Sequence, residues 1–271
     1  MAELNSNVRS KEQGQVKQMA DVLTYTVESG VATMTMRRAD ARNALNHELR
    51  DALRAGFARF AGDGDAKVLV VAGDGPTFCA GADLKEMAQT GMQVPPPDFV
   101  PTIAEFPDCH KPVIAAVQGA ALGGGFCLAL WCDLIVADEA ATFGITEARW
   151  GRGAPWALPL VSIVGPRAAT QLLATATAVS ANRAYEMGLV NEVAPAGSHL
   201  VAAQAMAAQI AGMAPLSVQA GLRMVRQLAR AGFADAAADV AAMWQPVYTS
   251  ADAQEGPRAF AEKREPKWAG A

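Results

Sequence analysis

The sequence predicts an α/β fold in which helices pack on a mostly parallel sheet. Hydrophobic residues make up 51% of the 271 residues and charged residues only 18%, against ~25% in a typical globular domain, so apolar material for a core is plentiful. Short apolar runs alternate with segments of helical periodicity from residue 22 to about 195, which is the order that a parallel sheet with crossover helices requires. Beyond residue 195 the pattern is helical only.

A hairpin and several single strands are expected to form the sheet. The hairpin strands lie at 22–27 and 31–36, where apolar and polar residues alternate with a period of two on either side of Glu28-Ser29-Gly30. Short, mainly apolar runs after the hairpin indicate buried strands. These runs lie at 68–72, 113–117, 134–137 and 142–144.

The predicted helices lie between and after these strands. Asn46 begins the first, because its side chain can accept a hydrogen bond from the first turn and apolar residues recur at helical spacing up to Phe60. Short helices are expected near 84–90 and from the glycines at 123–125 to Trp131. Beyond these, Ala-rich segments of helical periodicity predict further helices. They lie at 200–213, 216–228 and 236–248.

We expect one α/β core with a different kind of segment at each end. Residues 1–20 mix charges without an apolar run, which excludes a signal peptide and predicts a flexible tail. The core spans 21–195, and 196–271 forms a helical region whose apolar stripes predict oligomerisation. The stretch 112–132 carries no charge, but Gln118 and several glycines divide it into a strand, a turn and the start of a helix, so we predict no membrane span.

The charge and the cysteine content indicate which compartment and which partners to expect. The net charge is −4, the wrong sign for a protein that coats a nucleic-acid backbone, so we expect no nucleic-acid partner. The four cysteines show no Cys-x-x-Cys spacing and no short secreted framework surrounds them, which favours reduced thiols and a cytoplasmic location. The three histidines are scattered and form no His-Glu-x-x-His pattern, so no metal site is indicated.

Two glycine-rich segments, each after a predicted buried strand, are the candidates for chemistry. Residues 78–84 read Phe-Cys-Ala-Gly-Ala-Asp-Leu, and residues 119–126 read Gly-Ala-Ala-Leu-Gly-Gly-Gly-Phe. Neither has the Gly-Lys-Ser/Thr ending of a phosphate loop or the Gly-x-Gly-x-x-Gly order of a dinucleotide site. Each alone is typical of a tight turn. As a pair in one sheet they can direct two backbone N–H groups at one oxygen, an oxyanion hole for an enolate or a tetrahedral oxyanion.

Further motifs occur in order along residues 21–268. They are Arg42-Asn-Ala-Leu-Asn46, the segment 78–87, Lys111-Pro-Val-Ile-Ala-Ala-Val-Gln-Gly119, Gly123-Gly-Gly125, Cys132-Asp133, Phe143-Gly144 and the stretch 250–268. In this order they resemble the crotonase (enoyl-CoA hydratase/isomerase) superfamily. The resemblance implies a spiral of ββα units with an all-helical C-terminal part, assembled as a homotrimer or a dimer of trimers. It also implies an acyl-CoA thioester as substrate, with coenzyme A entering as part of that substrate and no permanently bound cofactor.

The resemblance also implies binding roles. The family's oxyanion donors fall on the backbone N–H groups of Ala82 and Gly124, which would bind the thioester carbonyl, whereas Asp83 more readily caps the following helix. Further positions match residues that contact CoA in the family: Ala80 and Leu84 along the CoA arm and adenine, Arg38 at the phosphates, and Phe260 and Lys263 at the CoA of a neighbouring subunit. Two features weaken these assignments. A usual proline near the phosphate position is replaced by alanine, and the C-terminal pair has helix packing and a solvated lysine as its alternative.

The catalytic positions depart from those of a standard hydratase. Hydratases of the family hold a water between two glutamates that act as general base and acid. Glu147, after Phe143-Gly144, matches the second, but Cys127 stands at the first, and a thiol of pKa ~8.5 polarises water weakly. One retained glutamate resembles the Δ3,Δ2-enoyl-CoA isomerases, in which one base moves a proton between C2 and C4. In an apolar pocket Glu147 would have a raised pKa that suits both steps.

We therefore predict an acyl-CoA enzyme that isomerises or hydrates an enoyl-CoA, with Glu147 as the base and isomerisation favoured. The alternatives are an acyl-CoA hydrolase, lyase or decarboxylase of the same fold, and a non-catalytic, RNA-binding relative. Cys127 as a covalent nucleophile is a further alternative. Arg149, Trp150 and Arg152 follow the glutamate, and either shape the acyl pocket or lie on the surface as charges and a packed indole.

Overall fold

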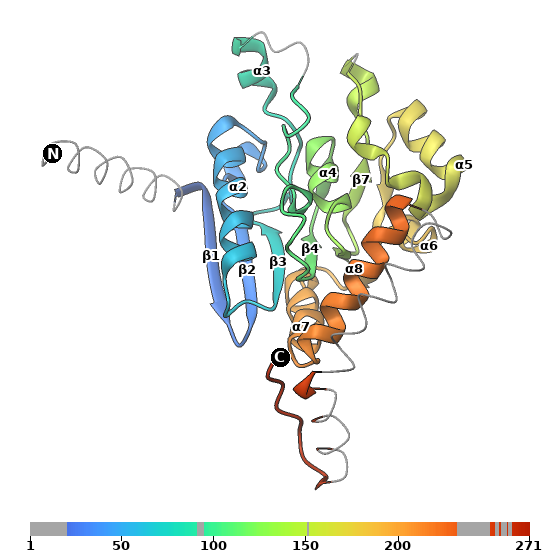
Figure 1. Cartoon of the computed structure of the whole chain (residues 1–271). Helices are drawn as coiled ribbons and strands as arrows, with labels where there is room; N and C mark the ends of the chain where they lie inside the picture. Colours follow the sequence, from blue (N-terminus) through green and yellow to red (C-terminus); the bar gives the residue numbers. More distant parts are fainter. Residues whose placement is uncertain are drawn as a thin grey trace, which may run out of the picture.

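The computed structural model of the chain describes residues 21–90, 95–150, 152–231, 250–252, 255, 259 and 262–271. The expected tail at 1–20, the expected helix at 236–248 and the candidate residue Phe260 lie outside the described residues. Within them, two sheets and the helices around them build the molecule (Figure 1).

A six-stranded sheet with the order β1-β2-β3-β4-β6-β9 lies at the centre. Its strands are β1 (Leu23–Glu28), β2 (Val31–Met36), β3 (Val68–Gly73), β4 (Val113–Val117), β6 (Leu134–Asp138) and β9 (Glu192–Ala194). The first two pair antiparallel and every later pair is parallel. The predicted hairpin and the mostly parallel sheet are therefore confirmed, with β9 added at the edge.

A small second sheet lies between the main sheet and the candidate site. It consists of β5 (Ala120–Leu122), β7 (Thr142–Gly144) and β8 (Val179–Ser180). The first two run parallel, and β8 pairs antiparallel with β7. Of these strands only β7 is predicted from the sequence, because β5 lies within the glycine-rich segment 119–126, which is typical of a turn, and β8 has only two residues. The pairing ends with the N–H of Gly123 donating to the carbonyl of Gly144 at 2.9 Å.

The predicted helices up to residue 131 and those at 200–213 and 216–228 are confirmed, whereas the helices at 160–175 and 181–186 were not predicted. The helices of the described residues are α2 (His47–Gly62), α3 (Leu84–Thr90), α4 (Gly124–Leu130), α5 (Leu160–Thr175), α6 (Ala181–Glu186), α7 (His199–Ala211) and α8 (Pro215–Ala231). Short 3-10 turns are η1 (Ala39–Ala41), η2 (Ile103–Glu105), η3 (Glu147–Trp150) and η4 (Pro155–Ala157). The side chain of Asn46 accepts a hydrogen bond from the N–H of Leu49 at 3.0 Å, which confirms the predicted cap.

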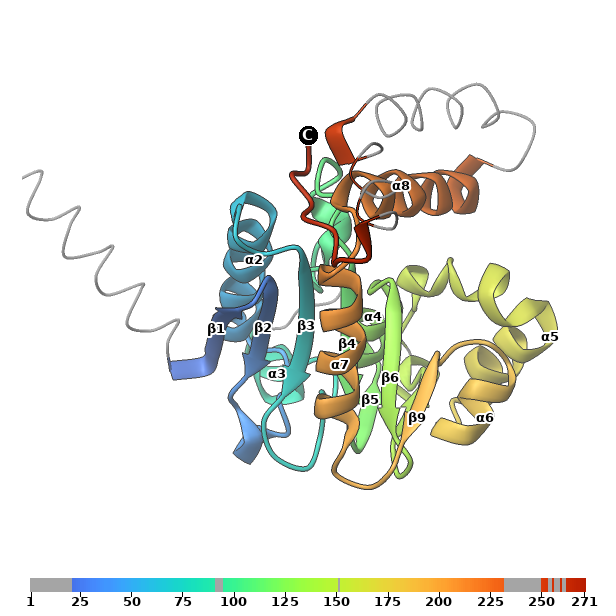
Figure 2. The ribbon, with the colours of Figure 1, turned by 90° about the horizontal axis from the view of Figure 1, so that it is seen from below.

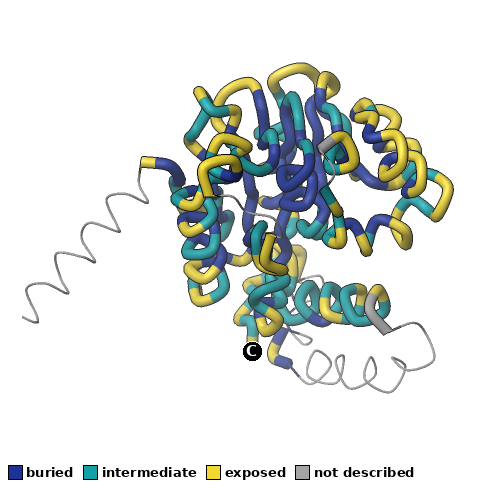
Figure 3. Tube along the Cα trace, turned by 90° about the horizontal axis from the view of Figure 1, so that it is seen from above, coloured by how far each residue is buried: buried dark blue, intermediate teal, exposed yellow. Residues whose placement is uncertain are grey.

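The main sheet has a buried core on each face (Figure 3). Side chains alternate along β3, so Leu69 and Val71 face the larger cluster, with α2 and α4, while Val68 and Val70 face α7. Figure 2 shows α7 lying across that second face. The helix therefore belongs to the core, although the boundary near residue 195 and the oligomerisation role of 196–271 stay predictions.

The alanines of α7 make this close packing possible. Ala203, Ala207 and Ala211 recur every four residues, are buried, and pack against Val68, Ile114 and their neighbours. Among the described residues no single helix is long and apolar enough to cross a membrane. Taken together, α7 and the segment Pro215–Ala229 would pass that test, but they are bent by 112°.

Candidate active site

A pocket of about 1580 Å³ lies where several strands end. Residues after the carboxyl ends of β2, β3, β5 and β7 line it, which is the usual place for a ligand in a parallel α/β sheet. The segment 95–100, η4 and Trp131 complete the wall. Among the predicted site residues, the lining includes Arg38, Ala80, Ala82, Leu84, Gly124, Cys127 and Glu147.

One isolated bridge, between Leu45 and Ala82, fixes the direction of the Ala82 amide. The N–H of Leu45 donates to the carbonyl of Gly81 at 2.8 Å, and the N–H of Asp83 donates to the carbonyl of Leu45 at 3.3 Å. In such a parallel bridge the central residue turns its own N–H to the opposite side. Within the described part of the chain, the N–H of Ala82 donates no hydrogen bond, so it is available to a ligand in the pocket.

The Gly124 amide lies beside it for a different reason. Gly124 is the first residue of α4, so its N–H has no acceptor within the helix, and no acceptor for it occurs elsewhere among the described residues. A Cβ atom at Gly124 would lie 3.7 Å from the nitrogen of Ala82, and one at Gly81 would lie 3.4 Å from the nitrogen of Gly124. The structure thus brings the two predicted donor groups together at one wall.

Close approach of α4 to the 78–84 segment depends on glycine. A Cβ at Gly125 would lie 2.1 Å from the carbonyl oxygen of Cys79, which no side chain can occupy. Gly123 has a φ of +54°, in the region that favours glycine. The run of three glycines therefore lets the helix begin against the backbone of the first glycine-rich segment.

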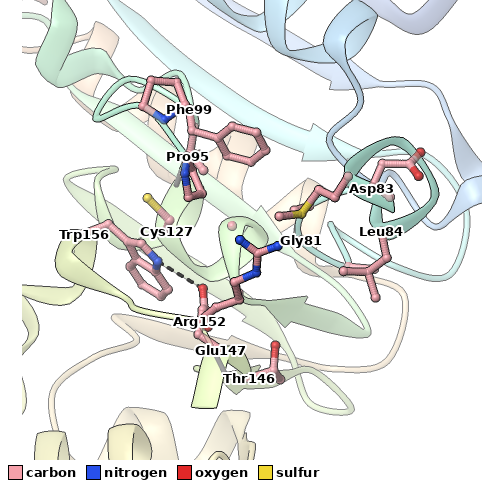
Figure 4. Close-up of a pocket in the computed structure, with 18 of the residues that line it drawn as sticks. Gly81, Asp83, Leu84, Pro95, Phe99, Cys127, Thr146, Glu147, Arg152 and Trp156 are labelled. Carbon is pink, nitrogen blue, oxygen red and sulfur yellow. Dashed lines mark hydrogen bonds between the residues drawn. The ribbon is translucent and has the colours of Figure 1, made fainter. Parts of the chain in front are cut away.

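Glu147 opens η3, just after β7, and its side chain faces the same turn. A Cβ at Gly123 would lie 3.4 Å from Oε1 of Glu147. This oxygen accepts a hydrogen bond from Nε1 of Trp156 at 3.1 Å (Figure 4). The other oxygen, Oε2, is shielded from solvent and has no hydrogen-bond partner among the described residues.

Burial sets the acidity of this carboxyl group. Loss of hydration raises the pKa of Glu147 above its ordinary value, the direction that the sequence predicts. The hydrogen bonds from Trp156 and from the backbone of Thr146 and Glu147 offset part of that effect. The group therefore gives up a proton less readily than a surface glutamate and binds one more readily.

Cys127 stands in the pocket as an uncharged group. Its side chain is buried in α4, three residues after Gly124. Burial first, and then the negative charge of Glu147, raise the pKa of the Cys127 thiol far above its usual range. It is therefore protonated at neutral pH, which removes the thiolate that a covalent nucleophile would need. Of the two positions that the sequence analysis assigned to catalysis, only the one occupied by Glu147 carries a carboxylate.

Arg38 lines the pocket but already has partners. Its guanidinium pairs with Asp83 at 3.3 Å and donates to the carbonyl of Ala44. Asp83 also accepts hydrogen bonds from the N–H groups of Lys85 and Glu86, at 3.1 and 3.3 Å. It therefore caps α3, as expected, and a phosphate near Arg38 would share the arginine with this carboxylate.

Some of the remaining predicted residues line the pocket and others lie outside it. Leu84 is 54% exposed at the mouth of the pocket, whereas Lys263 is exposed and does not line it. Of the residues after the glutamate, Arg152 lines the pocket and Arg149 lies exposed outside its lining. The side chain of Trp150 lies outside what the structure describes. Sequence reasoning did not identify Trp156 as a partner of the glutamate.

Comparison with known proteins decides the family. The family model for enoyl-CoA hydratase/isomerase matches residues 26–271. The chain belongs to the enoyl-CoA hydratase/isomerase, or crotonase, family. Enoyl-CoA hydratase EchA19 of Mycobacterium tuberculosis is 36% identical over 266 residues, which cover 90% of this chain and 98% of that protein. The 2,3-dehydroadipyl-CoA hydratase of Escherichia coli is 35% identical over 251 residues, 92% of this chain and 98% of that protein.

Solved structures extend the likeness to the fold. The crystal structure of an enoyl-CoA hydratase from Mycobacterium tuberculosis H37Rv superposes with a TM-score of 0.84 at 36% identity, covering 93% of this chain and all of that one. That of a probable enoyl-CoA hydratase/isomerase from Mycobacterium abscessus gives 0.82 at 35% identity, covering 93% and 99%. The two sheets with C-terminal helices are the crotonase fold that the motifs imply.

Proposed function

We propose that this crotonase-family chain shifts the double bond of an enoyl-CoA thioester by proton transfer, with Glu147 as its base. The observation that carries the proposal is one carboxylate of raised pKa in the same pocket as two amides that donate no hydrogen bond within the described residues, with a neutral thiol at the other catalytic position. The thioester oxygen would accept hydrogen bonds from Ala82 and Gly124. Coenzyme A enters as part of the substrate, and no permanently bound cofactor is required.

The proposed reaction needs one base that acts twice. Glu147 takes a proton from the carbon next to the thioester carbonyl of a 3-enoyl-CoA, and the electron pair of that C–H bond moves into a dienolate. Its negative charge resides on the oxygen held by the two amides, which stabilises the transition state. The protonated carboxyl then returns the proton to C4, which gives the 2-enoyl product. A raised pKa suits both steps, because the group must accept and release a proton near neutral pH.

Hydration is the second candidate, and the relatives favour it. The two curated relatives named above are both hydratases at 35–36% identity. Addition of water, however, requires one group to activate the water and another to protonate the substrate carbon. Cys127 retains its proton and is a poor base, so the residues of this chain support isomerisation over hydration.

The test is to incubate the purified chain with matched 2-enoyl and 3-enoyl CoA thioesters of several chain lengths. Isomerisation leaves the mass unchanged and moves the double bond, whereas hydration adds the mass of one water. We expect isomers as the main product, and Glu147→Gln to lower turnover ~100- to ~10,000-fold. Efficient hydration by the wild type, or undiminished turnover in the Gln variant, would overturn the proposal.

A further inference from the structure

We propose that Trp156 is a positioning residue that holds the Glu147 carboxylate in its reactive orientation. This inference rests on the proposed function of Glu147 as the base. A glutamate side chain has three rotatable bonds, so its carboxylate needs a fixed contact to stay beside the oxyanion donors. The indole N–H of Trp156 is the one side-chain donor to that carboxylate among the described residues.

The contact holds one oxygen and leaves the other without a donor. Oε1 receives the hydrogen bond at 3.1 Å and lies beside Gly123, which directly precedes the donor Gly124. Oε2 has no hydrogen-bond partner among the described atoms and is shielded from water. Fixing Oε1 therefore sets the plane of the carboxylate relative to the pair of amides, without satisfying the second oxygen.

Trp156 is itself braced by the helix that carries the oxyanion donor. Its ring packs edge-on against Phe126 of α4, with centroids 5.8 Å apart and an interplanar angle of 76°. Phe126 also packs edge-on against Phe143 of β7, the strand that leads to Glu147, again at 5.8 Å. A third aromatic residue, Trp131, donates from its own indole to the backbone carbonyl of Trp156 at 3.1 Å. The buried ring of Phe126 thus contacts both the tryptophan that donates to the base and the strand that leads to the base, and it belongs to the helix that begins with the oxyanion amide.

A neutral donor suits this place better than a cation. A hydrogen bond from an uncharged N–H favours the carboxylate form only moderately, so burial still keeps the pKa of Glu147 raised. Two titratable or charged side chains line the pocket together with this carboxylate, namely Cys127 on α4 and Arg152 on the loop after η3. α5, which packs against η3, contributes only the exposed Arg167. Among the contacts of the described residues, the hydrogen bond from Trp156 is therefore the one to which we assign the orientation of the base.

Two substitutions separate the donor from the ring. Trp156→Phe keeps an aromatic ring on Phe126 but removes the N–H. Trp156→His keeps a donor, because the five-membered ring of histidine has Nε2 where the indole has Nε1. The control is Trp268→Phe, since Trp268 donates to the carbonyl of Gly212 and does not line the pocket. Folding of each variant is checked by circular dichroism and thermal unfolding.

The readout is isomerisation of a 3-enoyl-CoA thioester from pH 5 to 9. We expect Trp156→Phe to lower kcat about 10- to 100-fold, as loss of orientation typically does, with little change in KM. The acidic limb of its kcat/KM profile should move to higher pH, because the lost hydrogen bond favoured the charged carboxylate. Trp156→His, compared above pH ~7 where its ring is neutral, should recover part of kcat, and Trp268→Phe should match the wild type.

The outcomes distinguish this inference from the proposed function. If Glu147→Gln abolishes turnover while Trp156→Phe keeps the wild-type kcat and acidic limb, the positioning role is wrong and the base assignment stands. If Glu147→Gln is fully active, the proposed function itself fails. Equal losses in the Phe and His variants, with an unshifted acidic limb, would mean that the indole acts only by packing.

Discussion

Glu147 occupies a position that disfavours its own charge. One oxygen of its carboxylate is shielded from water, and the group receives one side-chain hydrogen bond where a solvated carboxylate would have several partners. Such a group costs folding free energy and is retained where its altered pKa serves chemistry. Burial also raises the pKa of Cys127, at the neighbouring catalytic position, but a thiol with a raised pKa stays neutral, so no charge is buried there.

The first residue-scale prediction concerns stability. The folded-state pKa of Glu147 is raised above its unfolded value, so the native state is penalised once pH exceeds the unfolded pKa of ~4.3. Glu147→Gln removes this penalty and should raise Tm at pH 7, by ~2–4 °C for each kcal/mol recovered. The difference should vanish near pH ~3, where the carboxyl group is protonated in both states. Thermal unfolding at the two pH values measures it, and a lower Tm at pH 7 would contradict it.

The second residue-scale prediction concerns position 127, where a cysteine stands in place of a carboxylate. Cys127→Glu would restore two carboxylates in the pocket, and hydration of 2-enoyl-CoA thioesters should rise from its low wild-type rate by ~100-fold or more, since a positioned acid or base contributes that much. Cys127→Gln is the matched control, because it has the size of glutamate without the charge. Equal hydration rates in the two variants would show that the carboxylate adds nothing.

At the scale of elements, α4 combines several tasks in seven residues. Its first N–H faces the pocket, Phe126 braces the tryptophan, Cys127 lines the cavity, and its glycines admit the neighbouring loop. A short helix can do this because its side chains at consecutive positions point to different surroundings. The position of the helix start is therefore the feature of the fold on which the candidate site depends most.

The prediction at this scale is made at Gly124. Gly124→Pro removes the N–H but keeps a backbone conformation that proline tolerates at the first helical position, and should lower turnover ~100- to ~1000-fold. Gly124→Ala is the matched control, because it adds a Cβ against Leu45 and Val100, at 3.0 and 3.2 Å, while keeping the donor. Turnover should thus be higher in the Ala variant. A folded Pro variant with near-normal kcat would exclude the oxyanion role.

At the scale of the molecule, the outer surface of α5 and its neighbours is unusually apolar. Large hydrophobic side chains lie exposed there: Leu158 at 80%, Val161 at 45%, Ile163 at 40% and Tyr185, on α6, at 56%. Exposed apolar patches on a folded protein mark interaction surfaces. This surface is the observation from which we expect an assembly of identical chains.

We therefore predict that the chain is an oligomer in solution. Light scattering at micromolar concentration should give at least three times the 28.2 kDa of one chain. Leu158→Glu places a charge on the exposed apolar surface and should lower that mass, whereas Arg183→Glu, at an exposed polar position on α6, should leave it unchanged. A wild-type mass of 28.2 kDa would count directly against the prediction.

Local pattern was sufficient for most of the elements and for the two glycine-rich segments. The hairpin, α2 with its Asn46 cap, β3, β4 and α4 were all predictable because periodicity and capping act over a few residues. Motif order was also sufficient for the family, since it requires no knowledge of contacts. The strands β5, β8 and β9 were not predicted. β5 lies in a glycine-rich segment that is typical of a turn, and β8 and β9 are short segments without an apolar run that become strands only through their partners.

Tertiary structure alone decided which residues of the site contact one another. Trp156 and Glu147 are separated by a turn and a loop whose path no local signal describes, so their hydrogen bond could not be predicted. The same holds for Arg38, which sequence assigns to a phosphate and which the fold also pairs with Asp83. Hydrogen bonds and burial depend on which atoms meet in space, and therefore so do the raised pKa of Glu147 and the neutrality of Cys127. The sequence determined which groups are present, and packing determined their protonation and their partners.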